Sequence, residues 1–414
     1  SDVYKRQEHI LDLDIEYVRK QFPAFDVPDL INKGFFENAG GSYVCRQVID
    51  RLNRFYTEKK VQPYGAFEAS ISGGYEMDEA RVGLARYLGV KEQEVSFGPS
   101  TSQNTYVLAK AFGEWLVPGN AIIVTNQDHE ANTGSWRRLS NQGVEVKEWQ
   151  VNEETGELNL EDLDDLLDEN VKLLCFPHCS NIVAHINPVK EIVSKAHMAG
   201  AYVCVDGVSY APHGLPNVGD IGADIYLFSS YKTYGPHQGI MVIQEPLAEL
   251  LPNQGHYFNS KYLTKKFTPA GPDHAQIAAC AGIVEYFDEL AMHHGIKSAD
   301  APSGVHDMIR NYEQRLLQPL LDYVCTKNSI RLLGPSFASK RAPTVALDLG
   351  YNSFDVAKKL SGLNVLAGGD DFYAVRLLEA LGVDLEHGVL RLSFVHYTKE
   401  EEVAAVIQAL EEVL

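Results

Sequence analysis

Residues 224–239 read DIYLFSSYKTYGPHQG and place a lysine, Lys232, just beyond an apolar run. The run at 225–228 is typical of a buried strand, and the glycines and proline that follow the lysine indicate a loop. Burial of an ammonium group is costly unless its charge is paired or removed. One chemistry that needs a neutral amine at such a place is an imine between the lysine and an aldehyde cofactor. An ordinary lysine on a surface loop would produce the same local pattern, so the rest of the chain has to decide between the two interpretations.

The overall composition favours a globular protein of the cytoplasm. The chain has 414 residues, 45% apolar and 22% charged, which is enough for two domains and a large core. Its 36 Lys and Arg against 56 Asp and Glu give a net charge of −20, which disfavours nucleic acid or an anionic membrane as a partner. The six cysteines are scattered and form no zinc-binding module, so we expect reduced thiols and no bound metal. No apolar run approaches the length of a membrane span.

Strand and helix patterns alternate along the central chain and predict an α/β fold. Short apolar runs alternate there with segments of helical periodicity, which favours a mainly parallel, doubly wound sheet covered by helices. The expected strands are 121–126, 144–149, 171–176, 202–205, 225–228 and 240–243, and the expected helices are 45–62, 75–89, 102–116, 131–142, 160–168 and 188–199.

Polar side chains gather where the predicted strands end, which is where ligands bind in sheets of this kind. Asp206 ends the apolar segment AYVCVD, and a buried carboxylate needs a cationic partner such as a protonated pyridine nitrogen. The same residue would also suit a turn before Gly207. His129 follows another strand and is suited to stack on an aromatic ring, although a lone histidine is more often structural. In the company of Lys232, these residues favour a site for a pyridine cofactor.

Hydroxyl groups at the predicted start of helix 102–116 form a candidate anion site. Thr101 and Ser102 lie in GPSTSQN, where the helix dipole and the N–H groups of the first turn favour a phosphate, although simple N-capping explains the same residues. Ser229 would add a third hydroxyl, and Asn181 is placed to donate to a phenolic oxygen. A lysine, a carboxylate, a stacking ring and a phosphate cradle are together what pyridoxal 5'-phosphate requires.

The chain resembles the class V aminotransferase family of fold-type I pyridoxal-phosphate enzymes, close to its cysteine desulfurase and selenocysteine lyase branch. The resemblance extends from about residue 34 to the C-terminus. It implies a mainly parallel, seven-stranded sheet in a large cofactor-binding domain at 34–265, and a smaller α+β domain made of 1–33 and 266–414. The motifs that carry it are NAGG (38–41), GPSTSQN (98–104), DHEAN (128–132), SNIVAHINPV (180–189), VDGVSYAPH (205–213), SSYKTYGPHQG (229–239) and RLSFVHYTKEEEV (391–403).

The resemblance also implies a role for each matching residue. Catalysis would rest on Lys232 as the Schiff-base lysine, Asp206 as the partner of the pyridinium nitrogen and His129 as the stacking residue. The substrate, an amino acid as a small molecule, would be bound by Arg391, whose guanidinium suits an α-carboxylate, and by Asn38 and Gly40. The residues that would bind pyridoxal 5'-phosphate are Thr101, Ser102, His129, Asn181, Asp206, Ser209, Ser229, Tyr231 and Lys232.

Three departures from the family pattern bear on the reaction. Ser209 stands where desulfurases often have glutamine, which removes one hydrogen bond to the cofactor. Pro272 stands where relatives supply a threonine to the phosphate of the neighbouring subunit, and proline has neither a hydroxyl nor an N–H to offer. No cysteine follows Cys325, whereas desulfurases carry a nucleophilic cysteine in a loop before the last strand. The departures favour an aminotransferase or a lyase over a cysteine desulfurase.

The expected chemistry is abstraction of the α-proton of an amino acid by Lys232, followed by transamination, β-elimination or racemisation. A true cysteine desulfurase and a non-catalytic binding protein with the same fold are the alternatives. Residues 368–373 are expected to form a loop that closes over the substrate side chain, where two aspartates, Asp370 and Asp371, would favour a polar or cationic group. Family likeness implies a homodimer with the site near the interface, and the loops at 63–74 and 252–272 are the candidate segments that cross it.

Overall fold

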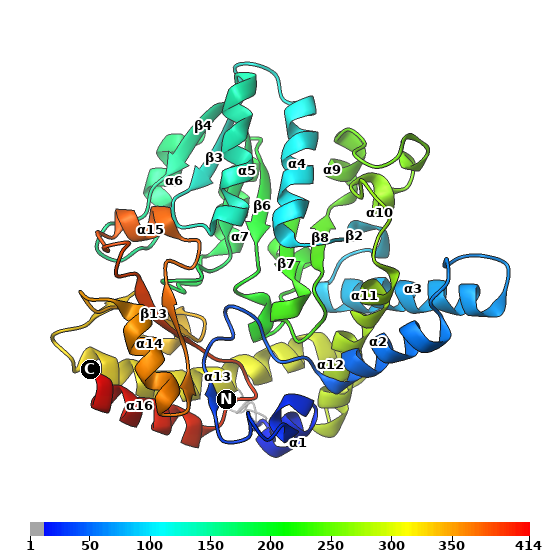
Figure 1. The fold of residues 1–414 in the computed structure, drawn as a ribbon. Helices are drawn as coiled ribbons and strands as arrows, with labels where there is room; N and C mark the ends of the chain where they lie inside the picture. Colours follow the sequence, from blue (N-terminus) through cyan, green and yellow to red (C-terminus); the bar gives the residue numbers. More distant parts are fainter. Residues whose placement is uncertain (1–11) are drawn as a thin grey trace, which may run out of the picture.

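The structure, a computed structural model, describes residues 12–414 and shows one large sheet with helices on both faces and a smaller sheet at one end (Figure 1). The predicted α/β fold is confirmed, including the seven strands of the main sheet. Residues 1–11, part of the predicted small-domain segment 1–33, lie outside the described residues. Among the residues that are described, no helix is both long enough and apolar enough to cross a membrane.

The main sheet is parallel except at one edge. Its strand order is β2-β8-β7-β6-β5-β3-β4, and β8 runs antiparallel to both of its neighbours, β2 and β7. The strands from β7 to β4 are parallel to one another, so their carboxyl ends lie at the same edge of the sheet. The strands are β2 (Val95–Gly98), β3 (Ala121–Thr125), β4 (Glu145–Trp149), β5 (Val171–Pro177), β6 (Tyr202–Asp206), β7 (Ile225–Ser229) and β8 (Gly239–Ile243).

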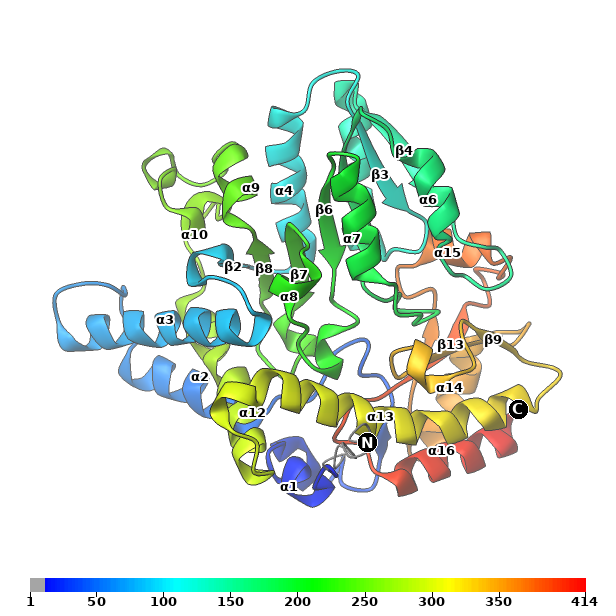
Figure 2. The same cartoon turned by 180° about the vertical axis from the view of Figure 1, so that it is seen from behind.

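Alternate residues of the central strands enter two different hydrophobic clusters, because successive side chains of a strand point to opposite faces. In β7, Ile225 and Leu227 belong to one cluster, whereas Tyr226 and Phe228 belong to the other. Figure 2 shows α7 and α8 on the second of these faces. The helices that cover the sheet are α4 (Thr101–Trp115), α5 (Gly134–Arg137) and α9 (Glu245–Leu250) on the first face and α6 (Leu160–Leu166), α7 (Val189–Met198) and α8 (Val218–Ile221) on the second.

The prediction of a single helix at 131–142 is wrong. This segment forms a 3-10 turn at Glu130–Asn132, the short helix α5 and a second 3-10 helix at Arg138–Gln142. Asn132 Nδ2 donates to the buried Asp128 carboxylate at 2.8 Å, and Thr125 Oγ1 donates to the other carboxylate oxygen at 2.5 Å. Such local side-chain bonds compete with the regular hydrogen bonds of a helix and interrupt it.

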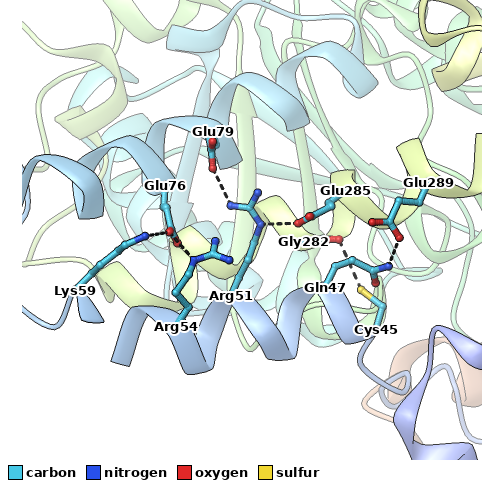
Figure 3. A network of polar contacts seen from close by, with 10 residues as sticks. All are labelled: Cys45, Gln47, Arg51, Arg54, Lys59, Glu76, Glu79, Gly282, Glu285 and Glu289. Atoms are coloured by element: carbon cyan, nitrogen blue, oxygen red, sulfur yellow. Dashed lines mark hydrogen bonds and ion pairs between the residues drawn. The ribbon is translucent and has the colours of Figure 1, made fainter. Parts of the chain in front are cut away.

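The N-terminal helices pack against helices from the C-terminal half of the chain, and Figure 3 shows polar contacts that join them. Helices α2 (Arg46–Glu58) and α3 (Glu68–Leu88) pack with α11 (His274–Ala279) and α12 (Ala281–His293). Arg51 of α2 is the link between three helices, because it pairs with Glu79 of α3 and with Glu285 of α12, both at 2.8 Å.

The predicted loop 63–74 is shorter than expected. Helix α3 begins at Glu68 and therefore includes Gly73 and Gly74 from the end of the predicted loop. A Cβ atom at Gly74 would lie 2.7 Å from the ring of Tyr64, so glycine is needed here for the preceding loop to fold back on the helix. Close packing, rather than turn formation, explains this glycine.

The C-terminal part of the chain forms a smaller α+β unit that lies below the main sheet in Figure 1. Its four-stranded sheet has the order β12-β13-β10-β9 and is antiparallel throughout. The elements are β9 (Arg331–Leu333), β10 (Thr344–Asp348), β12 (Gly368–Asp370) and β13 (Val389–Ser393), with α13 (Ala301–Cys325), α14 (Ser353–Gly362), α15 (Val375–Ala380) and α16 (Glu400–Val413).

The segment after α1 (Ile15–Lys20) connects the two parts of the chain. Strand β1 (Gly34–Phe35) pairs in parallel with β11 (Val365–Leu366), and Glu37 forms a bridge with Ser393 of β13. The start of the predicted large domain is therefore tied to strands of the smaller unit. The division into 34–265 and 1–33 plus 266–414 stays a prediction.

Candidate active site

A cavity of about 280 Å³ opens at the carboxyl ends of β5, β6 and β7. Its walls come from several separate segments that the parallel sheet brings to one edge, which makes it the candidate active site. All nine residues predicted to bind the cofactor line this one cavity, and their individual roles stay predictions. They are Thr101, Ser102, His129, Asn181, Asp206, Ser209, Ser229, Tyr231 and Lys232.

Lys232 ends a 3-10 turn that directly follows β7. Only 8% of the residue is exposed, and no described residue forms a hydrogen bond or an ion pair with its Nζ. Burial lowers the pKa of Lys232 to about 8, an effect that Arg391 strengthens and that Asp206 and Glu37 oppose. A distant segment fixes the backbone of Lys232, since Ser42 Oγ donates to the Lys232 carbonyl at 2.7 Å. The cavity therefore contains an amine that loses its proton near pH 8, well below the usual pKa of a lysine.

Asp206 ends β6 and presents a carboxylate to the same cavity. Its Oδ1 accepts a hydrogen bond from the Val208 N–H at 2.8 Å. Burial raises the pKa of Asp206 to about 6, and the Val208 N–H and Lys232 oppose this shift. A cation bound in the cavity would offset the cost of keeping this carboxylate ionised.

The start of α4 has the form expected of an anion site. Ser100 caps the helix by accepting a hydrogen bond from the Gln103 N–H at 3.2 Å. The hydroxyls of Thr101 and Ser229 lie 2.8 Å apart, so two chain segments meet at the helix start. A Cβ atom at Gly239 would lie 2.6 Å from the Thr101 nitrogen, which shows how closely β8 approaches this point. Hydroxyls and backbone N–H groups at the positive end of a helix suit a phosphate.

His129 contributes a neutral ring to the cavity wall. Its Nδ1 accepts a hydrogen bond from the Ala131 N–H at 3.0 Å, which fixes the ring. Burial lowers the pKa of His129 to about 3, with Lys232 and Arg391 adding to the shift. A fixed and uncharged imidazole is suited to stack on an aromatic ligand.

Asn181 connects the cavity with the smaller unit. Its Nδ2 donates one N–H to the Phe372 carbonyl at 2.9 Å, and the second N–H remains for the predicted bond to a phenolic oxygen. Its Oδ1 is buried without a hydrogen-bond partner among residues 12–414. The side chain therefore has unused hydrogen-bonding capacity toward a ligand.

Arg391 lies on β13, at the side of the site formed by the smaller unit. It is 3% exposed, and its Nη2 lies 2.6 Å from Oε1 of Glu37. Its Nη1 donates to the Asn181 carbonyl at 3.4 Å, and the ring of Phe372 covers the guanidinium at 3.6 Å. Burial lowers the pKa of Arg391, and Glu37 opposes this. Sequence reasoning missed Glu37 and Phe372, and the only local sign of Glu37 was its place directly before the NAGG motif.

The two other residues predicted to bind substrate, Asn38 and Gly40, lie near Arg391 but make different contacts. Asn38 donates through Nδ2 to the Phe35 and Ser393 carbonyls, both at 3.1 Å, and its Oδ1 accepts from the Tyr397 hydroxyl. Its polar atoms thus hold β1 against β13. Gly40 lies beside Glu37, because a Cβ atom at this glycine would be 2.8 Å from Oε1 of that residue. Both roles in substrate binding stay predictions.

The predicted loop at 368–373 is wrong for its first three residues, which form β12 and pair with β13. The turn that follows lies over the site. Phe372 and Tyr373 have positive φ angles of 52° and 59°, and the Tyr373 carbonyl accepts from the Glu130 N–H at 2.9 Å. The two aspartates bond within the turn, since Asp370 Oδ1 accepts from the Asp371 N–H and Asp371 Oδ1 from the Tyr373 N–H, both at 2.8 Å. Their effect on substrate choice stays a prediction.

Cys179 also lines the cavity, which sequence reasoning did not predict. It is 2% exposed, and burial raises its pKa to about 12, so the side chain is a neutral thiol at pH 7. Within the described chain, no group of three or more His, Cys, Asp or Glu residues is arranged to hold a metal ion.

The residues of this cavity fit pyridoxal phosphate. Lys232 offers an amine that is neutral near pH 8, and Asp206 is a buried carboxylate whose raised pKa calls for a cationic partner. Asn181 lines the cavity and keeps one Nδ2 N–H that it does not use on Phe372, which suits a ring oxygen. The helix start at Thr101 supplies hydroxyl and N–H groups for a phosphate.

Comparison with known sequences places these features in a family. The family described as Aminotransferase class-V matches residues 34–406. The aminotransferase-like protein FGM3 of Gibberella zeae is 33% identical to the chain, over 97% of this chain and 98% of that protein. A cysteine desulfurase of Yersinia pseudotuberculosis serotype O:1b is 27% identical, over 96% of this chain and 98% of its own length.

Solved structures share the fold. A cysteine desulfurase of Thermococcus onnurineus NA1, solved in its apo form, superimposes with a TM-score of 0.83 at 22% identity, over 97% of this chain and 98% of that one. The cysteine desulfurase CsdA of Escherichia coli gives a TM-score of 0.81 at 20% identity, also over 97% and 98%. This likeness confirms the predicted fold-type I architecture.

Proposed function

Because the chain belongs to the class-V aminotransferase family, we propose that it is a pyridoxal-phosphate-dependent enzyme that acts at the α-carbon of an amino acid. The observation that carries this proposal is the state of Lys232, a buried amine without an ion pair in the described chain and with its pKa lowered to about 8. A lysine that serves only the fold is expected to satisfy its ammonium group. Lys266 does so, because its Nζ donates to the Ala248 and Glu249 carbonyls at 2.6 and 3.0 Å.

The residues that line the cavity, together with Arg391, which does not line it but contacts Asn181, would share the work of this reaction. Bound pyridoxal phosphate supplies an electron-poor ring that takes up the electron pair left at the substrate α-carbon. Asp206 would hold the ring nitrogen protonated, and His129 would cover one face of the ring. Lys232 would bind the cofactor and accept the α-proton, since a pKa of about 8 suits a general base near neutral pH. Thr101 at the start of α4 would hold the phosphate, and Arg391 the substrate carboxylate.

Within this chemistry we propose transamination or elimination rather than desulfuration. Sulfur transfer needs a thiolate within reach of the substrate, and the sequence has no cysteine after Cys325. The cavity cysteine, Cys179, is a neutral thiol because burial raises its pKa to about 12. A true cysteine desulfurase is the second candidate, favoured by the presence of Cys179 in the cavity wall and by the name of the Yersinia relative.

Covalent attachment of the cofactor provides the first test. Incubation with pyridoxal phosphate should turn the protein yellow, and borohydride reduction should fix the cofactor mass on the peptide that contains Lys232. Lys232→Ala should lose this labelling, whereas Lys266→Ala, a variant at another buried lysine, should keep it. A folded wild-type protein that takes up no cofactor would refute the proposal and favour a non-catalytic binding protein with the same fold.

A panel of amino acids separates the possible reactions. Sulfide, pyruvate and the aminated form of the cofactor are measured in parallel after each amino acid is added. Accumulation of the aminated cofactor identifies an aminotransferase, and pyruvate from a cysteine-like or serine-like substrate identifies an eliminating lyase. Sulfide from cysteine that disappears in Cys179→Ala would establish the desulfurase instead.

We further propose that the protein is a homodimer of the cytoplasm without nucleic acid or membrane as a partner. Exposed apolar side chains at 67, 71, 75 and 82 lie along one side of α3, and an exposed stripe of this kind is typical of a protein interface. Pro272 belongs to a groove beside the phosphate end of the cavity, because His237 lines both. The net charge of −20 disfavours nucleic acid and anionic membranes as partners. The unpaired cysteines are typical of a protein in the reducing cytoplasm. Light scattering of the purified protein tests the dimer.

A further inference from the structure

The arginine that is proposed to bind a substrate carboxylate already has a carboxylate from the protein itself. Glu37 Oε1 lies 2.6 Å from Arg391 Nη2, and the guanidinium is almost fully buried. One further N–H bonds to the Asn181 carbonyl at 3.4 Å, and Phe372 covers a face of the guanidinium. The Nε of Arg391 is buried and has no partner in the part of the chain that the structure describes.

Two glycines leave room for the carboxylate of Glu37. A Cβ atom at Gly40 would lie 2.8 Å from Oε1 of Glu37, and one at Gly368 would lie 2.6 Å from Oε2. A side chain at either position would force the carboxylate of Glu37 to shift. These glycines belong to distant segments, so the tertiary structure, and not a local turn, creates the space.

The ion pair between Glu37 and Arg391 leaves a polar atom of each residue without a hydrogen bond. Oε2 of Glu37 is buried without a hydrogen-bond partner among residues 12–414, and so is Nε of Arg391. A carboxylate that serves only to neutralise a buried guanidinium gains most from two parallel hydrogen bonds. The single bond at Nη2 leaves donors of Arg391 available to a second carboxylate.

We propose that Glu37 is the resident counter-ion of Arg391, which neutralises the guanidinium before substrate binds and then competes with the substrate carboxylate for it. The inference rests on the proposed function, in which Arg391 binds that carboxylate. A buried guanidinium without a counter-ion is unfavourable, so the resident carboxylate stabilises the protein until a ligand arrives. Glu37 is therefore a positioning and specificity-determining residue, which touches Arg391 and not the reacting atoms.

This pair also narrows the class of substrate. With Glu37 ionised, the positive charge of Arg391 is already balanced. Asp370 adds negative charge nearby, since it opposes the lowering of the pKa of Arg391 by burial. A second carboxylate on the substrate would be repelled by the carboxylates of Glu37 and Asp370. The preferred substrates are accordingly amino acids with neutral or cationic side chains, and acidic side chains are disfavoured.

Binding of acetate and of its uncharged analogue acetamide tests the role of Glu37. Affinity is read from the ligand-dependent rise of the unfolding temperature of the purified full-length protein. Glu37→Gln keeps a hydrogen-bond acceptor for Arg391 but removes the competing charge. It should bind acetate at least about tenfold more tightly than wild type, which corresponds to about 1.4 kcal/mol, and should bind acetamide no more tightly. This gain in acetate affinity should disappear when Arg391→Met is combined with Glu37→Gln.

Two further variants keep the result interpretable. Glu402→Gln removes the partner of another poorly exposed arginine, since Glu402 pairs with Arg19 at 2.8 Å away from the cavity, and it should bind acetate like wild type. Glu37→Asp keeps the charge on a shorter side chain and should give an intermediate gain even where the glutamine variant folds poorly. Equal or weaker acetate binding by both Glu37 variants would overturn the proposal. Failure of the cofactor to attach to Lys232 would refute the proposed function separately, because the acetate measurement needs no cofactor.

Discussion

Replacement of Lys232 by methionine should stabilise the cofactor-free protein while it abolishes cofactor attachment. The reason is the free energy needed to bury an amine whose pKa falls from 10.5 to about 8. A shift of about 2.5 units, at about 1.36 kcal/mol per unit, makes folding less favourable by about 3 kcal/mol at pH 7. Solvent screens this effect little, because the residue is almost fully buried. Methionine is similar in length and removes no hydrogen bond or ion pair with a described residue, and the only cation–π contact of Nζ in the described chain is a distant one, 5.9 Å from the ring of Tyr231.

The gain in stability should depend on pH in a definite direction. Below pH 8 the lysine is protonated in both the folded and the unfolded state, so the full cost is present. Between about pH 8 and pH 10.5 the unfolded chain binds more protons than the folded one, and wild-type stability therefore rises with pH. The advantage of Lys232→Met should shrink from about 3 kcal/mol at pH 7 to about 1 kcal/mol at pH 10.

Urea unfolding of the cofactor-free proteins at pH 7 and pH 10 measures this difference directly. Lys266→Met is the matched control, because this lysine is also buried but donates to the Ala248 and Glu249 carbonyls. Its loss leaves those carbonyls without their donor and should destabilise the protein. The reasoning is refuted if Lys232→Met is no more stable than wild type at pH 7, or if its advantage does not shrink at pH 10.

Four more predictions follow from the same contacts. Asp206→Asn should still attach the cofactor to the active-site lysine but lower turnover at least about a hundredfold in steady-state kinetics, because the ring nitrogen loses its anionic partner. Cys179→Ala should keep its turnover, since the thiol is protonated at neutral pH, and a loss of product would show that this sulfur takes part. Tyr75→Glu places a charge on the apolar stripe of α3 and should give a monomer in light scattering. L-aspartate should bind at least about tenfold more weakly than L-asparagine, a difference that should narrow in Glu37→Gln as measured by calorimetry.

The central fold was predictable because its strands are buried on both faces. Such strands appear in the sequence as continuous apolar runs, and 225–228 is one of them. The errors arose where side chains, not the backbone pattern, decide the local structure. Asp128 binds Asn132 and interrupts the expected helix at 131–142, and Gly74 serves packing within α3 although it resembles a turn residue.

The site was predictable only on the side of the large sheet. Lys232, Asp206 and Asn181 follow strands of one parallel sheet, so their convergence follows from the topology. The contact between Glu37 and Arg391 does not, because 354 positions separate them and they meet only where the segment after β1 bridges to β13. No rule based on sequence spacing predicts a contact between residues so far apart in the chain.

The turn after β12 shows how the two sides of the site depend on each other. Phe372 and Tyr373 both adopt the left-handed region, which costs about 1–2 kcal/mol for each residue, so the contacts around the turn have to offset this strain. Those contacts are the Asn181 amide on one side and the Glu130 N–H on the other, and both residues lie in segments that follow strands of the large sheet. The strained turn holds the Phe372 ring against one face of Arg391. Because all guanidinium N–H groups point outward in the plane of the group, a covered face leaves the edges open. A substrate carboxylate must therefore approach along an edge, and that is where Glu37 already binds.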